Sequence, residues 1–324
     1  MLRRPAPQPA LHGGDHVALL ALRQHPGRRV HLSLEVPIAD AHLHVWDPRA
    51  HYYPWLCDEQ PIAFRYGDYA ALRRPYLVAD YRADSAGWPV TAGVYVEAEW
   101  DPRDPGGEMD FIAAIRKAHG FPTVAIAQAR LHRSGCAELL EAHAARGFVR
   151  GIRHKPAPGM MDDAGWRAGY ERLAGFGLHF ELQAPWTQLA EAARLARAFP
   201  DTALVLNHTG LPADRTPEGL AGWRAALREL AACPNAAAKI SGLGVPGAPW
   251  TVEANRGIVL AAIELFGARR AMFASNFPVD GLCASFDTIF AGFETITRGF
   301  SPAERRALFH DNAVRLYRME HTHG

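Results

Sequence analysis

The sequence predicts an α/β fold, a (β/α)₈ TIM barrel with an N-terminal extension. Short strand-like runs recur about eight times from residue 37 onward, and stretches with helical spacing of apolar residues separate them. Such alternation favours βα units and a parallel sheet, and eight units of this kind close into a barrel. We therefore expect an extension over residues 1–36 and one barrel domain over residues 37–324.

The expected strands are short, and longer helical intervals rich in Ala, Arg, Glu and Leu lie between them. The strands cover Ile38–His44, Gly93–Glu99, Val124–Arg130, Phe148–Lys155, Leu178–Gln183, Ala203–His208, Ala236–Ser241 and Ala271–Asn276. The helices cover Glu108–His119, Glu138–Arg146, Trp166–Phe176, Leu189–Phe199, Leu220–Ala232 and Arg256–Phe266. The run Ser301-Pro302-Ala303-Glu304 has the pattern of a capping box and predicts the start of a terminal helix.

The N-terminal extension begins with a stretch rich in Pro, Arg and Gly. Between residues 17 and 36, two short apolar runs flank His25-Pro26-Gly27-Arg28-Arg29, which makes a hairpin plausible. A loosely held extension without a role in the chemistry is the alternative. The apolar stretch Val17–Leu22 is too short for a signal peptide or a membrane span, so no export is expected.

Composition narrows the classes of partner. The chain has 35 Lys and Arg against 34 Asp and Glu and no basic stripe, which argues against binding to nucleic acid or to a membrane. Its four cysteines lie far apart, without a C-x-x-C pair, so a reducing, cytoplasmic location fits best. We expect a small-molecule substrate as the partner, with a homodimer left open.

Strand parity predicts where the polar side chains point, because successive residues of a strand face opposite sides. The polar sets are Asp40, His42 and His44; Glu97 and Glu99; Gln128 and Arg130; His179, Glu181 and Gln183; and Lys239 and Ser241. Burying so many polar groups for structure alone would be costly. We therefore expect these sets to face one interior site at the carboxyl ends of the strands, where barrel enzymes place their chemistry.

Histidines stand out within this set. His42-Leu43-His44 puts two imidazoles on one strand face, roughly 7 Å apart, so that both can reach one metal ion or one substrate oxygen. His208 ends another strand at the equivalent height. The alternative is that these are hydrogen-bonded barrel histidines with a structural role only.

Five motifs occur in an order that resembles the amidohydrolase-2 family and, within it, the sugar-lactonase and pyrone-dicarboxylate-lactonase group. The resemblance runs from about Pro37 to Tyr317. The motifs are Asp40-Ala41-His42-Leu43-His44-Val45-Trp46-Asp47, Gly151-Ile152-Arg153-His154, Asn207-His208-Thr209-Gly210, Ser275-Asn276-Phe277-Pro278-Val279-Asp280 and Asn312-Ala313-Val314-Arg315-Leu316-Tyr317.

The resemblance implies a barrel enzyme that hydrolyses a lactone or a related small carbonyl compound. By position, His42 and His44 match the first-strand H-x-H, Arg153 and His154 the fourth-strand pair, and His208 the sixth-strand histidine. Asn276 stands where many members have Asp, and an amide can form hydrogen bonds but cannot take a proton from water. The predicted catalytic set is His42, His44, Arg153, His208 and Asn276.

Lactone hydrolysis needs a nucleophilic water, donors for the oxyanion and groups that hold the substrate. Arg153 and Lys155 share strand parity and could form an oxyanion or carboxylate clamp, or they could instead be ion-paired with nearby glutamates. The base stays open among Glu97, Glu99, Asp280 and a first-strand histidine. The predicted substrate-binding set is Glu97, Glu99, Gln128, His154, Lys155 and Gln183.

The predicted metal ligands, if a metal is used, are His42, His44 and His208. Three histidines with a nearby carboxylate would suit Zn²⁺, which lowers the pKa of a bound water to about 7. Some lactonases that the chain resembles work without metal, however, and Asn276 weakens the ligand set. Zn²⁺ or another divalent ion and metal-independent catalysis are therefore held as equal alternatives.

The leading hypothesis is a hydrolase that opens a small sugar-acid or dicarboxylate lactone by attack of water in the barrel mouth. One alternative is a metal-dependent decarboxylase of the same superfamily. A non-catalytic barrel that binds a ligand is the other, and Asn276 motivates it.

Overall fold

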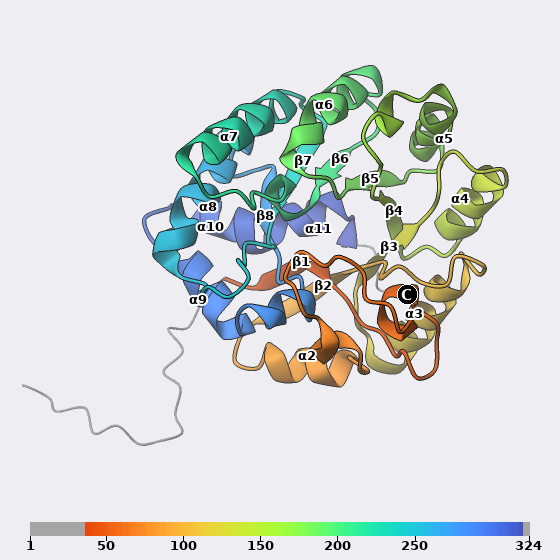
Figure 1. Ribbon diagram of the computed structural model, residues 1–324, viewed down its shortest axis with the longest axis horizontal. Helices are drawn as coiled ribbons and strands as arrows, with labels where there is room; N and C mark the ends of the chain where they lie inside the picture. Colours follow the sequence, from red (N-terminus) through yellow and green to blue (C-terminus); the bar gives the residue numbers. More distant parts are fainter. Residues whose placement is uncertain (1–35, 320–324) are drawn as a thin grey trace, which may run out of the picture. The chain divides into compact units, whose positions relative to one another are not determined.

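The computed structural model describes residues 36–319, and the expected N-terminal hairpin lies outside them. Eight parallel strands form one sheet in the order β1 to β8, each paired with the next (Figure 1). The strands are β1 Ile38–Leu43, β2 Val90–Val96, β3 Val124–Gln128, β4 Val149–His154, β5 His179–Leu182, β6 Leu204–Leu206, β7 Ala236–Ile240 and β8 Ala271–Phe273. The last strand meets the first, because the Asn276 amide donates to the His42 carbonyl at 2.8 Å and the His44 amide to the Phe277 carbonyl at 2.8 Å. The predicted (β/α)₈ barrel is confirmed.

Helices surround the sheet. They are α1 Pro54–Cys57, α2 Val78–Asp84, α3 Gly107–His119, α4 Cys136–Ala145, α5 Ala164–Gly175, α6 Leu189–Ala198, α7 Pro217–Ala231, α8 Val252–Phe266, α9 Phe286–Ile296, α10 Pro302–Arg306 and α11 Asn312–Leu316. The predicted capping box is present at Ser301 and Glu304, at the start of α10. Helices α1, α2 and α9 were not anticipated from the sequence. Within residues 36–319, no helix has the length and apolar character needed to cross a bilayer.

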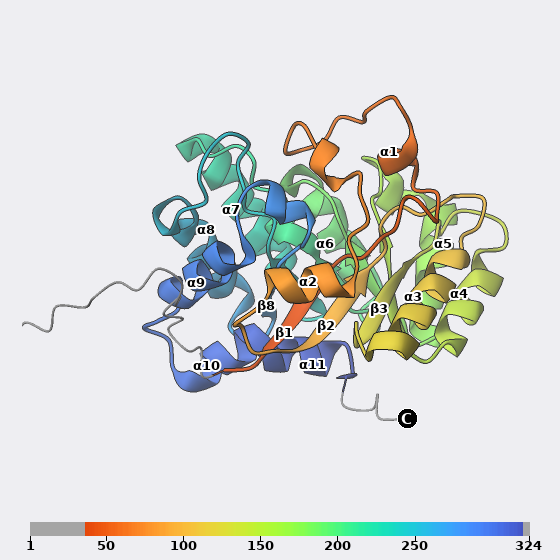
Figure 2. The same cartoon turned by 90° about the horizontal axis from the view of Figure 1, so that it is seen from below.

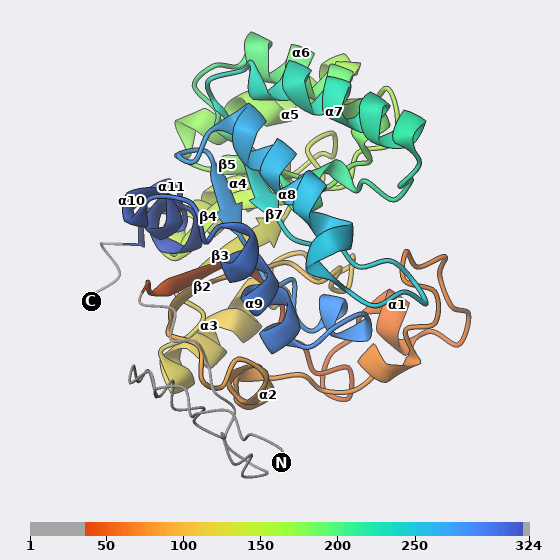
Figure 3. The ribbon, with the colours of Figure 1, turned by 90° about the vertical axis from the view of Figure 1, so that its left-hand side faces the viewer.

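Two apolar layers hold the barrel together. The larger cluster lies between the strands and the outer helices. The smaller one joins side chains of distant strands to the C-terminal segment, and its members include Ala39, Val124, Val205, Met272, Ala313 and Tyr317. Strands that far apart around a barrel can touch only through its interior. Figures 2 and 3 show α10 and α11 on the side of the strands opposite α1, so the C-terminal helices close one end of the barrel.

Strand parity holds for β3, β5 and β7 but is wrong for β1 and for the apolar set of β2. Phe180 and Leu182 lie in the outer layer, opposite His179 and Glu181, as predicted. On β1, however, Asp40 pairs with Gly93 and Leu43 with Tyr95, so three steps on β1 match two on β2. This bulge reverses the alternation within the strand.

Asp40 consequently faces the outer layer, away from the histidines. Its carboxylate accepts hydrogen bonds from the Tyr81 hydroxyl of α2 at 2.8 Å and the Ser275 hydroxyl at 2.6 Å. On β2, Val94 and Val96 belong to the inner cluster, not to the layer under the helices. The interior is therefore apolar toward the amino ends of the strands, and its polar groups gather farther along them.

Candidate active site

A cavity of about 220 Å³ collects the strand-end side chains. Of the residues predicted from sequence, seven line it: His44, Glu99, Arg153, Lys155, Gln183, His208 and Asn276. Three others, Glu97, Gln128 and His154, line an adjoining cavity of about 540 Å³, which shares Glu99, Arg153 and Lys155 with the first. Aromatic side chains of Trp46, Trp55 and Phe64 complete the first cavity. Its volume is below the ~300–1,000 Å³ typical of drug-sized ligands, so it suits a small substrate.

Three imidazoles meet at the base of the site. The His42 ring centroid lies 5.0 Å from that of His44 and 4.6 Å from that of His208. His42 is fully buried and is not among the residues that line either cavity. Its ring packs against those of His44 and His208, which do line the first cavity. Neither ring nitrogen of His42 has a hydrogen-bond partner among residues 36–319.

The hydrogen bonds of His44 fix its tautomer. Its Nδ1 lies 2.8 Å from the Val96 carbonyl oxygen, which can only accept, so Nδ1 carries the proton and Nε2 the lone pair. His208 places Nδ1 2.9 Å from the Ser241 hydroxyl, and either group can be the donor there.

All three imidazoles are held neutral. Burial and the charge of Arg153 lower the pKa of His44 to about 3. Burial and Lys239 lower the pKa of His42 well below its usual value, and burial and Arg65 do the same to the pKa of His208. A neutral imidazole can accept a proton, so these groups are available as acceptors at neutral pH.

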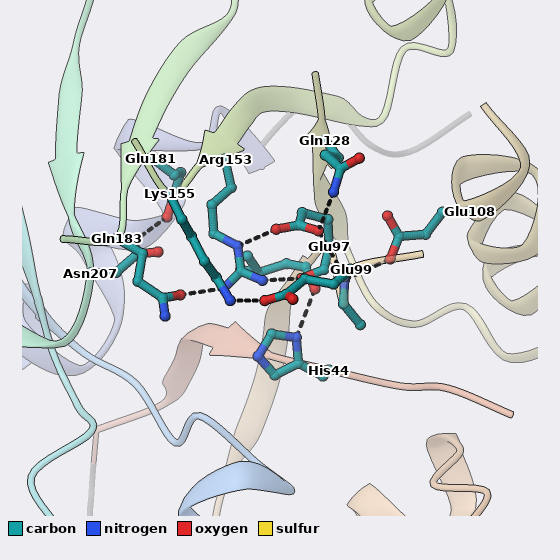
Figure 4. Close-up of polar contacts among 12 residues, drawn as sticks. His44, Glu97, Glu99, Glu108, Gln128, Arg153, Lys155, Glu181, Gln183 and Asn207 are labelled. Atoms are coloured by element: carbon teal, nitrogen blue, oxygen red, sulfur yellow. Dashed lines mark hydrogen bonds and ion pairs between the residues drawn. The ribbon is translucent and has the colours of Figure 1, made fainter. Parts of the chain in front are cut away.

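Each side-chain nitrogen of Arg153 donates a hydrogen bond to a neighbouring residue (Figure 4). Its Nε donates to a Glu97 carboxylate oxygen at 2.6 Å, its Nη2 to the Glu97 carbonyl, and its Nη1 to the Gln183 side-chain oxygen at 2.8 Å. Lys155 forms an ion pair with Glu99 at the cavity mouth. Of the two alternatives for these cations, the structure therefore shows the ion pairs. Because the Gln183 oxygen is occupied, its NH₂ group remains as a donor.

A second buried charge cluster lies under the histidines, and the sequence did not identify it as a unit. The Lys239 ammonium of β7 lies 2.6 Å from a carboxylate oxygen of Glu181 on β5. Glu181 also accepts from the Asn207 amide at 2.5 Å and from the Tyr317 hydroxyl at 2.6 Å. Burial alone would raise the pKa of Glu181, but Lys239 and His179 together outweigh it and the pKa falls to about 2. Burial lowers the pKa of Lys239 to about 8.

Asn276 is oriented by Asp280. The Asn276 NH₂ group donates to Asp280 at 2.7 Å, so the amide oxygen is the polar atom left to face the cavity. Asp280 is surrounded by donors, accepting also from the Tyr66 hydroxyl at 2.8 Å and from the Gly242 amide at 2.8 Å. This carboxylate lies behind the cavity wall, where its partners occupy it. Burial nevertheless raises the pKa of Asp280.

Asn276→Asp is expected to make folding stability depend more steeply on pH. The new carboxyl would lie in hydrogen-bond contact with Asp280, and two buried carboxylates cannot both ionise, so one pKa rises. When the pKa of a carboxyl is higher in the folded than in the unfolded state, the folded protein loses stability as pH rises above the unfolded-state pKa of about 4. Melting curves from pH 4 to 8 should show a gap between the variant and the wild type that widens with pH. A gap of constant size would refute the contact between the two carboxyl groups. Adding Zn²⁺ at pH 8 and measuring the melting temperature again tests whether the pair binds metal.

Three of the residues that line the first cavity have an unusual backbone conformation. Glu99, His208 and Asn276 all have positive φ, at 59°, 52° and 54°. Residues other than glycine adopt this region at a cost of order 1–3 kcal/mol, and such cases cluster at functional sites. Each follows the end of a strand, β2, β6 or β8, where the chain turns into its loop.

The residues present do not make a metal site in this arrangement. Within residues 36–319, no group of three His, Cys, Asp or Glu side chains is placed to hold a metal ion. The imidazoles have donor nitrogens, but the carboxylates near them are already bound: Glu97 to Arg153, Glu181 to Lys239, and Asp280 to Asn276 and Tyr66. The cations also oppose a divalent ion.

The sequence of the barrel matches a known family. A family model described as amidohydrolase covers residues 39–319, from the first strand to the end of the C-terminal helices. The chain belongs to the amidohydrolase family.

Several relatives of this amidohydrolase span almost its whole barrel. The uncharacterized protein y4mH of Sinorhizobium fredii is 41% identical over 88% of this chain and 99% of its own length. An L-fucono-1,5-lactonase of Burkholderia multivorans is 30% identical over 86% of this chain and 95% of its own. A crystal structure of a B. multivorans amidohydrolase with bound HEPES has a TM-score of 0.75 at 29% identity, covering 87% of this chain and 99% of that one.

Sequence reasoning missed Arg65, which lines the cavity, and Tyr66 and Tyr317, which hold buried carboxylates beside it. Arg65 and Tyr66 lie in the loop between α1 and α2, where no strand parity applies. Tyr317 ends a motif that was recognised, but no pattern in the motif indicates that its hydroxyl reaches Glu181.

Proposed function

We propose that this amidohydrolase opens the ring of a small sugar-acid or dicarboxylate lactone. The observation that carries the proposal is the cavity in which a neutral His208 lies with donors and acceptors at the strand ends. The related L-fucono-1,5-lactonase supports a sugar-acid lactone in particular.

The reaction begins with water attacking the lactone carbonyl carbon. His208, or His44 through its Nε2 lone pair, accepts the proton of that water, since both are neutral and line the cavity. The ring C–O bond then breaks, and the alkoxide that leaves takes a proton back from the imidazolium. The product is one hydroxy acid, which is a carboxylate at neutral pH.

The amides orient the substrate. The Gln183 NH₂ group offers a donor and the Asn276 oxygen an acceptor, which matches the hydroxyl groups of a sugar acid. Trp46, Trp55 and Phe64 supply apolar faces for the ring carbons.

A panel of lactones tests the proposal. L-fucono-1,5-lactone, D-glucono-1,5-lactone and 2-pyrone-4,6-dicarboxylate would be followed with a pH indicator at pH 7, because hydrolysis releases a proton. A blank without enzyme corrects for spontaneous opening. Turnover of one or more supports the proposal, and inertness toward all of them contradicts it. Release of CO₂ from aromatic acids would instead identify a decarboxylase.

We expect removal of metal to leave the rate of hydrolysis unchanged. The carboxylates that would complete a metal site are bound to Arg, Lys, Tyr or Asn side chains, so water activation falls to the imidazoles. Protein dialysed against a chelator and protein loaded with Zn²⁺ should therefore have the same kcat/KM. Loss of activity on chelation that Zn²⁺ restores would show that the side chains rearrange to bind the ion.

A further inference from the structure

Arg65 reaches the cavity from the loop between α1 and α2, outside the strands that supply the other polar groups. Its guanidinium lies over the Tyr66 ring, with its central carbon 4.4 Å from the ring centroid. One terminal nitrogen, Nη2, is 3.3 Å from Asp280. The other, Nη1, is buried and has no hydrogen-bond partner among residues 36–319.

In the other two cations of the cavity wall, every side-chain nitrogen already has a protein partner. Arg153 uses all three of its nitrogens on Glu97 and Gln183, and Lys155 is paired with Glu99. Of the three Arg and Lys side chains that the structure places on this wall, Arg65 therefore has a buried donor nitrogen left for a ligand.

The surrounding structure makes room for this guanidinium beside His208. A Cβ on Gly242 would lie 2.8 Å from Arg65 Nη1, 2.9 Å from Nη2 and 2.8 Å from the His208 Cβ. These distances are shorter than carbon atoms tolerate, so the absence of a side chain at Gly242 opens the space. The φ of +66° at this residue also favours glycine.

Asp280 contacts one terminal nitrogen of Arg65, Nη2, and leaves the other without a hydrogen bond. The Asp280 carboxylate takes its shorter hydrogen bonds from Asn276, Tyr66 and Gly242, and its contact with Arg65 is the longest of the four. The guanidinium is thus oriented by Asp280 and Tyr66, while Nη1 has no hydrogen-bond partner among residues 36–319.

We propose that Arg65 binds the carboxylate of the ring-opened hydroxy acid, and before it the oxyanion formed when water attacks the carbonyl. The proposal rests on the lactone hydrolysis proposed above and assigns the anion-binding role to Arg65 in place of Arg153 or Lys155. A guanidinium is suited to a carboxylate because its N–H groups match the two oxygens, and such charge-assisted hydrogen bonds are among the stronger ones.

Calorimetric titration with L-fuconate tests this assignment on the whole protein. L-fucitol, which has the same carbon chain and no carboxylate, is the uncharged comparison. In R65M we expect L-fuconate to bind roughly 10- to 100-fold more weakly, with weak L-fucitol binding unchanged. R65K keeps the charge but not the fork of donors, so it should fall between the two.

R73M is the matched control. Arg73 also lies over a tyrosine ring, 5.3 Å from the Tyr69 centroid, in the same part of the chain, but it does not line the cavity. Its L-fuconate affinity should equal that of the wild type. Melting temperatures of all variants verify folding, and R65K serves if R65M does not fold.

The outcomes separate the two proposals. Wild-type affinity for L-fuconate in R65M and R65K overturns the role of Arg65, and so does a wild-type protein that binds neither L-fuconate nor D-gluconate. Binding that depends on Arg65 in a protein that hydrolyses no lactone upholds the anion site and overturns the hydrolase proposal instead.

Discussion

We expect His208→Ala to lower kcat/KM for lactone hydrolysis by roughly 10²- to 10⁴-fold, the range that loss of a positioned acid–base group produces. His208 lines the cavity, is neutral, and lies against His42 with 4.6 Å between ring centroids. The Ser241 hydroxyl at 2.9 Å sets its ring orientation. The measurement is steady-state hydrolysis of whichever lactone of the panel is turned over fastest.

His143→Ala is the control for loss of a buried imidazole. His143 of α4 is also buried, and burial lowers its pKa to about 4, but it contacts the Gln128 carbonyl and lines neither cavity. This variant should lose stability and keep its kcat/KM. If His208→Ala behaves in the same way, with a lower melting temperature and unchanged kinetics, His208 has a structural role and the catalytic assignment is wrong.

The pH profile gives a further check on the same residue. The folded-state pKa of His208 lies well below 6.5, so the imidazole stays neutral as the pH falls through 6.5. The acid limb of kcat/KM should therefore lie well below pH 6.5. The stability that the neutral histidines contribute should be lost as pH falls from their unfolded pKa of about 6.5 toward their lower folded-state pKa. A rate that halves near pH 6.5 would mean that an exposed imidazole controls it.

The barrel could be predicted because its determinants are local. Each strand is a short apolar run and most helices show a clear 3.6-residue period, so the number and order of βα units follow from the sequence alone. Helices α1, α2 and α9 were missed: α1 and α2 have only four and seven residues, whereas α9 buries Phe286, Ile289, Phe290, Phe293 and Ile296 at a helical spacing that was overlooked in the sequence.

The candidate site was predictable where it lies on strand ends and not where it lies on loops. His44, His208 and Asn276 follow from their position after strands, and the cavity contains all three. Asp40 was misplaced because a β-bulge depends on pairing with β2, which one strand's sequence does not specify. Arg65 was missed because its place beside Gly242 depends on the course of the whole loop.

The pairing of the buried charges could not be read from sequence for a related reason. Parity placed Glu181 and Lys239 on polar faces, but nothing in either strand shows which cation meets which carboxylate. The structure pairs Lys239 with Glu181 and leaves Arg153 to Glu97. These choices depend on distances across the barrel, because neither pair joins adjacent strands: Glu181 and Lys239 lie on β5 and β7, and Arg153 of β4 meets Glu97 at the end of β2.

We expect the buried ion pair between Lys239 and Glu181 to contribute strongly to the free energy of unfolding. We expect Glu181→Gln to cost about 3–5 kcal/mol of unfolding free energy, because it leaves the Lys239 ammonium buried without a counter-charge. Both side chains are fully buried, and Arg153 adds further positive charge nearby. Urea denaturation at pH 7 measures the loss.

A surface pair and a double variant show whether burial is the cause. Arg197 and Glu229 are also ion-paired, at 3.5 Å, but their side chains are 51% and 42% exposed, so Glu229→Gln should cost at most about 1 kcal/mol. Combining Glu181→Gln with Lys239→Met removes both charges and keeps an acceptor for the Tyr317 hydroxyl. The double variant should therefore be more stable than Glu181→Gln alone.

The same pair gives the unfolding free energy a pH dependence of known sign. The pKa of Glu181 is about 2 in the folded state, below its unfolded value of about 4.3, so its contribution is complete above the unfolded value and is lost as pH falls toward 2. Glu181→Gln has no such group, so the difference between wild type and variant should shrink from pH 5 to pH 3. A difference that grows from pH 5 to pH 3 would show that Glu181 is protonated in the native protein, and a constant difference would show that folding leaves its pKa unchanged. Either result would contradict the ion pair with Lys239.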